Sequence, residues 1–241
     1  MTRMRLHRQS WGCTLVNDNS VATFYVLDLD RTLFDTEKAI AIMEEVVAVH
    51  DQVLARALSQ RFREYSEQGE SFSVREFIVD MTDEANMQVI EARYHEAARA
   101  QNLLLSGAKE LLSLVRSRPQ ARFGILTYGS PQGQAMKMRA AAGLEEAPFL
   151  VTSGRHKGEQ IAQWQQADGT YRLPEELGGV IAREVVFVDD KPFSFTGFPV
   201  DGTGYQVRGV KHVNDEPLPS HVTLVANLAE VVSLETARLS P

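Results

Sequence analysis

The sequence predicts an α/β protein in which helices cover both faces of a mostly parallel sheet, giving three layers. Short apolar runs recur along the chain, and each one ends abruptly in polar residues. Stretches with helical patterning separate these runs, as in a parallel sheet with helical crossovers. One longer helical block stands between the first run and the second. We therefore expect an all-helical insertion directly after the first strand.

The first apolar run covers residues 24–27 and is followed by Asp28, Asp30 and Thr32. A run of this length with β-branched and aromatic members is typical of a strand that is buried on both faces. Because charges are costly inside such a strand, we expect the two aspartates at or beyond its carboxyl end. In open α/β sheets, this is the edge where ligands bind.

The segment from about residue 36 to residue 101 is predicted to be entirely helical. It is rich in Ala, Glu, Arg, Met and Val, contains no proline, and has Gly69 as its only glycine. Apolar residues recur in it at helical spacing. Ser73-Val74-Arg75-Glu76 matches a capping box that opens one helix, and a last helix is predicted over 83–100. His95 in that helix is expected to be exposed.

Several elements are predicted beyond the insertion. A helix over 108–116 ends before Pro119, and a strand begins at Phe123. Ser130 and Pro131 are predicted as the N-cap and first residue of the next helix, with Gly143 as its terminator.

The rest of the chain continues the alternation. A strand is predicted over 149–151 and another over 185–188. The stretch 158–174 fits a helix or a hairpin that turns at Asp168-Gly169, and both interpretations stay open. Further strands are predicted around 205–210 and 222–225, and a final helix over 226–237. The phenylalanines at 193, 195 and 198 are interpreted as core.

Polar residues follow each central apolar run at the same end. The residues are Asp28 and Asp30 after the first run, Thr127, Tyr128, Gly129 and Ser130 after the second, Arg155, His156 and Lys157 after the third, and Asp189, Asp190 and Lys191 after the fourth. If the strands are parallel, these groups converge. Clustered carboxylates repel one another unless a cation lies between them, and oxygen ligands alone suit Mg²⁺ rather than zinc. A carboxylate in such a site can attack phosphorus to form an aspartyl-phosphate.

The same residues resemble a known family. Asp28-x-Asp30-x-Thr32, Thr127 after a hydrophobic strand, a lysine that opens the next segment, and Asp189-Asp190 are similar to the four motifs of the haloacid dehalogenase-like (HAD) hydrolase superfamily. Order and spacing agree from about residue 24 to about residue 190. The resemblance implies a Rossmann-like core, residues 1–35 and 102–241, and a helical cap, residues 36–101, that closes over the pocket.

The resemblance also implies roles for the first motif. Asp28 matches the nucleophile, which ligates the metal as well. Asp30 matches the general acid/base, with its backbone carbonyl as a further metal ligand. Dehalogenases of the superfamily lack an acid at this position, whereas phosphatases use it to protonate the leaving oxygen. An ordinary aspartate has a pKa of about 3.9, so the acid role calls for burial or neighbouring carboxylates that raise it.

The later motifs imply the phosphate and metal contacts. Thr127 matches the phosphate-binding hydroxyl, and we expect Tyr128 and Gly129 to contact substrate beside it. Lys157 matches the lysine of the third motif. Asp189 and Asp190 match the metal-binding acids of the fourth.

Three alternatives stay open around these motifs. Arg155 and Lys191 compete with Lys157 for the lysine role. Asp190 either supports the metal or caps the following helix and holds Lys191. Many phosphatases of the superfamily have glycine where this chain has Arg31, and this arginine either points away from the pocket or touches the substrate.

Composition narrows the function. The 241 residues are 44% hydrophobic and carry a formal net charge of −7, which argues against a nucleic-acid partner. The single cysteine, Cys13, excludes an internal disulfide and fits a reducing cytoplasm. No apolar run is long enough to span a membrane, and the basic start lacks a signal-peptide core, so residues 1–20 are interpreted as an extension.

These inferences predict a cytoplasmic, Mg²⁺-dependent phosphatase that hydrolyses a small phosphorylated metabolite through an aspartyl-phosphate. Two alternatives stay open: a phosphotransferase or mutase, and a catalytically silent phosphate-binding regulator. A signalling receiver domain also combines aspartates, threonine and lysine around Mg²⁺, but its acidic pair comes early in the chain. In this sequence the paired acids Asp189-Asp190 come last, so the order excludes it.

Overall fold

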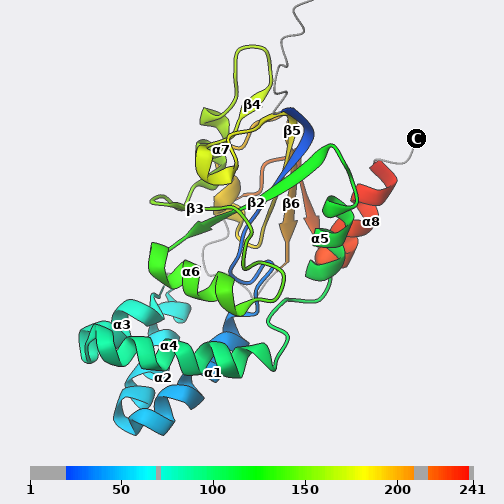
Figure 1. The fold of residues 1–241 in the computed structure, drawn as a ribbon. Coiled ribbons are helices and arrows are strands. Elements are labelled where there is room, and N and C mark those ends of the chain that lie inside the picture. The colour runs from blue at the N-terminus through cyan, green and yellow to red at the C-terminus, as the bar shows by residue number, and fades with distance from the viewer. Residues whose placement is uncertain (1–19, 69–71, 209–216, 239–241) are drawn as a thin grey trace, which may run out of the picture.

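The structure is a computed structural model that describes residues 20–68, 72–208 and 217–238. The predicted extension, except for Ser20, and Cys13 lie outside the described residues. Figure 1 shows a sheet flanked by helices and, below it, a separate group of helices.

Seven strands form one sheet with the order β3-β2-β1-β5-β6-β7, and β4 pairs with β5 off this path. The strands are β1 (Ser20–Leu27), β2 (Ala121–Tyr128), β3 (Phe149–Thr152), β4 (Tyr171–Arg172), β5 (Ile181–Asp189), β6 (Thr203–Val207) and β7 (Val222–Val225). All pairs are parallel except β4 with β5. The predicted α/β fold with a mostly parallel sheet is confirmed.

The chain order reverses at the centre of the sheet. From β1 the chain adds β2 and β3 on one side, and β5, β6 and β7 then extend the other side. A crevice forms outside the carboxyl ends of the strands where such an order reverses, and ligands bind there. Asp28 directly follows β1 and Asp189 ends β5, so both acids lie at this point.

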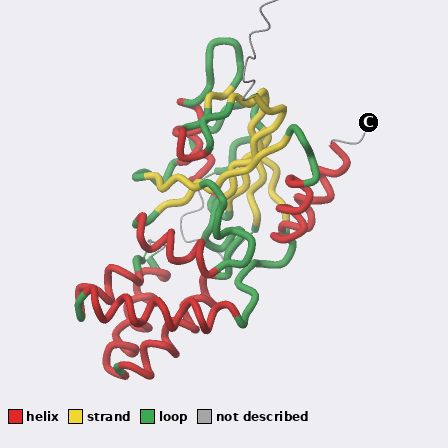
Figure 2. The backbone as a smooth tube through the Cα atoms, viewed as in Figure 1, coloured by secondary structure: helices red, strands yellow, loops and turns green. Residues whose placement is uncertain are grey.

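Helices cover both faces of the sheet (Figure 2). Side chains of β1 alternate between two apolar clusters, since Tyr25 and Leu27 belong to one cluster while Phe24 and Val26 belong to the other. The first cluster includes residues of α5 (Ala108–Arg116), α6 (Pro131–Ala140) and α8 (Leu228–Arg238). The second includes residues of α7 (Lys157–Gln163), η1 (Glu175–Leu177) and η2 (Pro192–Phe195). β1 is therefore buried on both faces, as its apolar sequence predicts.

Four helices follow β1 and form what we call the helical layer: α1 (Thr36–His50), α2 (Gln52–Glu67), α3 (Val74–Met81) and α4 (Glu84–Arg99). The side chain of Asp35 caps α1 by accepting from the Lys38 amide at 3.0 Å, and Asp51 caps α2 in the same way. In the described part of the chain, no helix is long and apolar enough to cross a membrane.

The capping box predicted at Ser73 is only partly right. α3 begins at Val74 with Ser73 as N-cap, but the Ser73 side chain makes no cap hydrogen bond to the backbone. Its hydroxyl instead contacts the Glu76 carboxylate and lies 3.0 Å from the Ser130 hydroxyl at the start of α6. The tertiary contact with Ser130 thus accompanies the loss of the local hydrogen bond from the helix backbone to Ser73.

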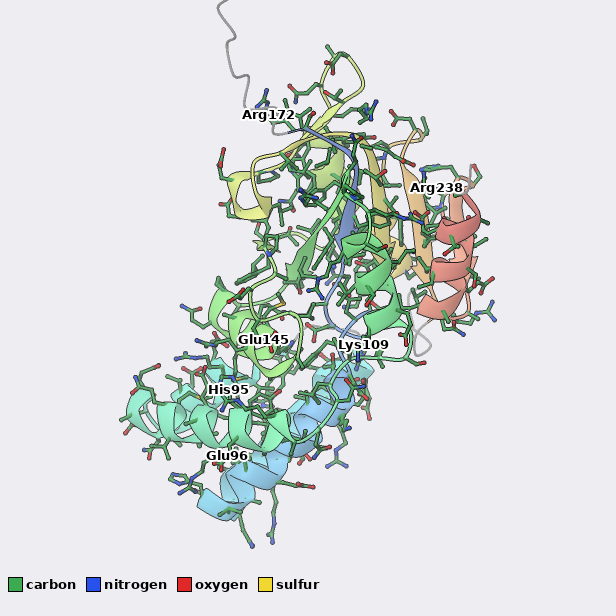
Figure 3. All side chains as sticks on the ribbon, turned by 45° about the vertical axis from the view of Figure 1, so that its right-hand side comes forward. His95, Glu96, Lys109, Glu145, Arg172 and Arg238 are labelled. Carbon is green, nitrogen blue, oxygen red and sulfur yellow. The ribbon has the colours of Figure 1, made fainter. Side chains whose placement is uncertain are left out.

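Polar contacts fasten the helical layer to α6. His95 of α4 lies 3.2 Å from the Met136 carbonyl, and Arg139 of α6 donates to Glu91 of α4 at 2.6 Å. His95 is half-buried, so the prediction of an exposed residue is wrong; Figure 3 labels it on the helical layer. Because α6 starts at the end of β2, the layer is held against the edge of the sheet where the acids lie.

The ambiguous stretch contains both predicted elements. α7 occupies Lys157–Gln163, and the chain then turns at Asp168-Gly169 into β4, with Gln165 bridged to Tyr171. Gly169 has φ +83°, a conformation that glycine adopts without strain. The predicted terminator Gly143 (φ +93°) lies in the turn beyond α6, which ends at Ala140.

Candidate active site

The loop after β1 fixes the first pair of acids. The Asp28 amide donates to the Val188 carbonyl of β5 at 2.9 Å, which continues the sheet pairing by one residue. The Leu29 carbonyl then accepts from the amides of Leu33 and Phe34 at 3.0 and 2.9 Å, closing a tight turn. Asp28 is buried, and the Thr32 hydroxyl donates to its Oδ2 at 2.8 Å. The Asp-x-Asp-x-Thr spacing therefore places Asp28 at the carboxyl edge of the sheet, with the Thr32 hydroxyl in contact with its carboxylate.

Arg31 has the only positive φ of a non-glycine residue in the described chain, at 61°. This conformation costs an L-residue with a Cβ about 1–2 kcal/mol, and it is free for glycine. The geometry explains why glycine suits this position in similar sequences. Arg31 Nε donates to Glu37 at 2.7 Å, and its guanidinium also reaches Ser66 of α2 at 3.0 Å. The side chain thus links the loop after β1 to the helical layer.

Lys157 lies between two of the acids. It is the first residue of α7, is 4% exposed, and its Nζ contacts Asp28 Oδ1 and lies 2.7 Å from Asp189 Oδ2. Neither Arg155 nor Lys191 makes such a bridge among the described residues. Gly158 allows this placement, because a Cβ there would lie 2.5 Å from the Thr196 carbonyl oxygen and 2.7 Å from the Phe198 nitrogen.

Three carboxylates form a buried cluster around this lysine. Asp28, Asp189 and Asp190 each offer an oxygen, and these oxygens all lie within 4.8 Å of one another. When ionised, the Asp28 and Asp189 carboxylates share the single ammonium of Lys157, which leaves these three groups a net charge of −1 in a buried site. A divalent cation with oxygen ligands would balance this charge, so the donor set fits Mg²⁺. The Asp30 side chain is not part of the cluster.

Thr127 is the penultimate residue of β2. It is 1% exposed, and its hydroxyl has no hydrogen-bond partner among the described residues although it lines the same pocket as Asp28 and Lys157. A buried hydroxyl without a partner costs about 1–3 kcal/mol, so such a group calls for a functional explanation. A phosphate oxygen in the pocket would supply the missing acceptor.

Asp30 turns away from the cluster toward α6. Its carboxylate accepts from Lys137 Nζ at 2.7 and 2.8 Å, from the Thr36 hydroxyl at 2.8 Å and from the Gln134 amide at 3.1 Å. Burial alone would raise its pKa, but the Lys137 charge and these hydrogen bonds outweigh burial and lower the pKa of Asp30 to about 2. A general acid at Asp30 is expected to have a raised pKa, but these contacts lower it instead.

The comparisons with solved structures agree with this geometry. A haloacid dehalogenase-like hydrolase from Burkholderia xenovorans LB400 is 16% identical, with a TM-score of 0.62 over 92% of this chain and 100% of that chain. CbbY from Rhodobacter sphaeroides, in complex with phosphate, is 16% identical, with a TM-score of 0.51 over 88% of this chain and 96% of that chain. The chain therefore shares the fold of these HAD-like hydrolases. No protein-family model and no curated protein matches its sequence.

Within this HAD-like fold, burial and neighbouring charges shift the pKa values of Asp28 and Lys157. Burial raises the pKa of Asp28 to about 6, with Lys157 opposing the shift and Asp189 adding to it. Burial alone would lower the pKa of Lys157, but Asp189 and Asp28 outweigh it and raise the pKa of this ammonium above its ordinary value. Lys157 is therefore a permanent cation next to Asp28.

The pocket beside Asp28 is lined by residues from both the sheet region and the helical layer. Its walls are Asp28, Asp30, Arg31, Thr36, Phe62, Ser66, Phe72, Thr127, Tyr128, Lys137, Arg155, Lys157, Lys191, Phe193 and Ser194. The predicted Asp28, Asp30, Thr127, Tyr128 and Lys157 are thus brought together. Gly129 lines a neighbouring, largely apolar cavity instead.

Sequence reasoning missed several of these lining residues, among them Lys137, Ser194 and Phe193. Lys137 follows Gln134 by three positions on α6, so both lie on one helix face, which is the signal that was available. Ser194 is 1% exposed, and its hydroxyl has no partner among the described residues. Phe193 is half-buried at the pocket wall, so only Phe195 and Phe198 are core as predicted.

Proposed function

We propose that this protein is a magnesium-dependent phosphatase that hydrolyses a small phosphomonoester through an aspartyl-phosphate. The observation that carries the proposal is Lys157, which joins Asp28 to Asp189 next to the unpartnered hydroxyl of Thr127. An anion-binding hydroxyl, a permanent cation and a buried carboxylate then line one pocket. This set suits an electrophile that carries negative charge, as a phosphate monoester does.

Asp28 is the nucleophile in this proposal. Thr32 and Lys157 hold its two oxygens, so the carboxylate is oriented before substrate arrives. One of these oxygens bonds to phosphorus while the bond from phosphorus to the leaving oxygen breaks. Lys157 and Thr127 donate to the phosphoryl oxygens as charge develops on them. Mg²⁺ bound by Asp28, Asp189, Asp190 and the Asp30 carbonyl would offset the repulsion between Asp28 and the incoming anion.

Asp30 moves the protons. It donates a proton to the leaving alkoxide and then accepts one from the water that attacks the aspartyl-phosphate, which releases phosphate and restores Asp28. Lys137 holds Asp30 as a carboxylate, the form that accepts a proton from water. To donate a proton, Asp30 must first be protonated, and this requires a weaker contact with Lys137. Because both Lys137 and Asp30 line the pocket, the substrate phosphate can share the Lys137 ammonium and weaken that contact.

We further propose that residues 36–101 act as a cap on a core of residues 1–35 and 102–241. Phe62, Ser66 and Phe72 reach the pocket from this segment, so closing it would remove water from the reacting groups. CbbY is solved with phosphate and, as a variant, with xylulose-1,5-bisphosphate, which supports a small phosphorylated substrate. The lone cysteine supports a cytoplasmic setting.

The test is phosphate release from 4-nitrophenyl phosphate with and without Mg²⁺. We expect turnover that Mg²⁺ raises and EDTA abolishes, and we expect Asp28→Asn to lower kcat by at least about 10³-fold. Asp80→Asn is the matched control, because Asp80 is exposed on α3 and lies outside the pocket. Substantial activity in the Asp28 variant would show that another residue is the nucleophile.

A further inference from the structure

Two cations flank one aromatic ring at the wall of the pocket. The guanidinium carbon of Arg155 lies 5.5 Å from the ring centre of Phe193, and Lys191 Nζ lies 5.7 Å from the same centre. We call these three residues the Phe193 cluster. Arg155 comes from the loop after β3 and Lys191 from the loop after β5, so two separate segments supply the charges. All three residues line the pocket that holds Asp28 and Lys157.

The charges of the Phe193 cluster are not compensated. Every other cation of the pocket has a carboxylate partner: Lys157 has Asp28 and Asp189, Lys137 has Asp30, and Arg31 has Glu37. Among the described residues, neither Arg155 nor Lys191 has such a partner within ion-pair distance. This is unexpected in a chain with a formal net charge of −7, where acidic partners are plentiful.

The aromatic ring holds the two cations without neutralising them. A cation beside an aromatic face is attracted to the ring and keeps its full charge. Lys191 is also half-buried, which makes its lack of a carboxylate partner more costly. Two fixed, unneutralised cations form a suitable site for an anion of the ligand.

The cluster lies close to the phosphate site along the chain. Arg155 is two residues before Lys157, and Lys191 is two residues after Asp189. Two residues span at most about 7 Å between Cα atoms, so the cluster and the catalytic groups are neighbours. An anion bound at the cluster would therefore belong to the same compact molecule as the phosphate that Asp28 attacks.

We propose that the Phe193 cluster binds a second anionic group of the substrate. On this inference, which rests on the proposed phosphatase function, the substrate is a compact phosphomonoester that also carries a carboxylate or a second phosphate. Arg155 offers a planar fork of donors, which both groups accept, and Lys191 adds a point charge. The nearby buried hydroxyl of Ser194 is a further donor without a partner among the described residues.

Matched substrate pairs test the proposal. With Mg²⁺ present, kcat/KM is measured for glycerol 3-phosphate against 3-phosphoglycerate, which adds a carboxylate, and for fructose 6-phosphate against fructose 1,6-bisphosphate, which adds a phosphate. We expect the wild-type protein to favour the second member of at least one pair by tenfold or more, since a charge-assisted hydrogen bond contributes about 1.5–3 kcal/mol. The pair that shows the preference identifies the second group.

Variants locate the preference. Arg155→Gln and Lys191→Gln should each lower the ratio of the two kcat/KM values by about tenfold, which corresponds to one charge-assisted contact. Arg172→Gln is the control, because Arg172 is exposed on β4 at the end of the core away from the helical layer (Figure 3). We expect this control to leave the ratio unchanged.

Two outcomes would overturn the inference. One is a wild-type ratio near one in both pairs. The other is an equal loss on both members of a pair in the Arg155 and Lys191 variants, which would mean that the cluster only attracts the reacting phosphate. Failure of the phosphatase proposal is distinguishable, because it would show as no phosphate release from any ester. Calorimetry with 3-phosphoglycerate and glycerol 3-phosphate in Mg²⁺ then still decides the inference, and equal affinities would contradict it.

Discussion

Two clusters of buried carboxylates differ in how completely they are compensated. Glu235 of α8 is fully buried, and it accepts from the hydroxyls of Tyr25 and Tyr205 at 2.5 and 2.8 Å and from Arg238 at 2.8 Å. The cluster of Asp28, Asp189 and Asp190 is equally buried, but in it the Asp28 and Asp189 carboxylates share the single ammonium of Lys157.

The difference separates a structural role from a chemical one. Each oxygen of Glu235 has a tyrosine and the arginine as donors, and nothing in its surroundings calls for a ligand. In the aspartate cluster, Asp28 instead lines a pocket together with Thr127 and Ser194, whose hydroxyls have no partner among the described residues. Burial of a charge alone does not indicate function; an unbalanced charge next to unsatisfied donors does. The following predictions test this contrast, from the largest expected effect to the smallest.

Removing a carboxylate from the unbalanced cluster should abolish function and spare the fold. We expect Asp189→Asn to lower kcat by at least about 10²-fold, because it takes away a metal ligand and a partner of Lys157. Without metal, Asp189→Asn should lose less unfolding free energy relative to the wild-type protein than Glu235→Gln does. The reason is that the Asp189 substitution neutralises one of several acids that repel one another. Steady-state kinetics and urea unfolding measure both quantities. Retained turnover would remove Asp189 from the site.

The balanced cluster should show the opposite behaviour. Glu235→Gln breaks the ion pair between the buried Glu235 carboxylate and the partly exposed Arg238, and we expect it to lower the free energy of unfolding by about 1.5–3 kcal/mol. Turnover of the folded protein should stay within about twofold, because Glu235 lies outside the pocket. A variant that stays stable but loses activity would contradict the structural role.

The same residue predicts acid sensitivity. Burial alone would raise the pKa of Glu235, but hydrogen bonds from Arg238, Tyr25 and Tyr205 outweigh it and lower the pKa. The folded protein therefore binds this proton less readily than the unfolded chain, so Glu235 stabilises the fold above the ordinary pKa of glutamate, about 4.3. This stabilisation is lost as the pH falls through the lowered pKa. The free energy of unfolding, plotted against pH across that window, should therefore have a smaller slope for Glu235→Gln than for the wild-type protein. Equal slopes would contradict the linkage.

Lys137 should have an intermediate effect on turnover. Lys137→Met removes the ion pair that orients Asp30, while the hydrogen bonds from Thr36 and Gln134 remain. We expect kcat/KM to fall by about tenfold, a part of the 10²–10⁴-fold that general acid–base catalysis contributes. Lys109→Met is the control, because Lys109 is exposed on α5 outside the pocket (Figure 3). Equal kinetics for the two variants would show that Lys137 does not position Asp30.

Arg31 should have the smallest effect on stability. Arg31→Gly relieves about 1–2 kcal/mol of backbone strain but adds freedom to the unfolded chain that costs about 0.4–1 kcal/mol, so the net change should lie within about 1 kcal/mol. Arg31→Ala keeps the strain and loses the same contacts to Glu37 and Ser66, so it should be less stable than the glycine variant. If Arg31→Ala unfolded at a higher temperature than Arg31→Gly, this result would contradict the backbone strain at Arg31.

The sequence predicts the sheet well because its signals are local. Apolar runs at 24–27 and 185–188 are long enough for strands, and the acids after them lie at the edge that a parallel sheet creates. The choice of Lys157 over Arg155 and Lys191 depends on a close approach at Gly158, which no local pattern shows.

The rest of the site depends on contacts between distant segments. Lys137 meets Asp30 because α6 packs at the carboxyl end of β1, more than a hundred residues away in sequence. Ser73 matches a capping box, yet its hydroxyl is used against Glu76 and Ser130. The contact with Ser130 is tertiary, so propensity and spacing do not reveal it.

The central claim is that Asp28 forms a covalent bond to phosphorus. The most direct measurement is borohydride trapping during turnover of 4-nitrophenyl phosphate with Mg²⁺, followed by peptide mass spectrometry. Reduction of an acyl phosphate on Asp28 converts that residue to homoserine, so the account predicts homoserine at position 28 and an unmodified Asp28 when substrate is left out. Turnover that leaves Asp28 unmodified, with the label on another residue or on none, would contradict it.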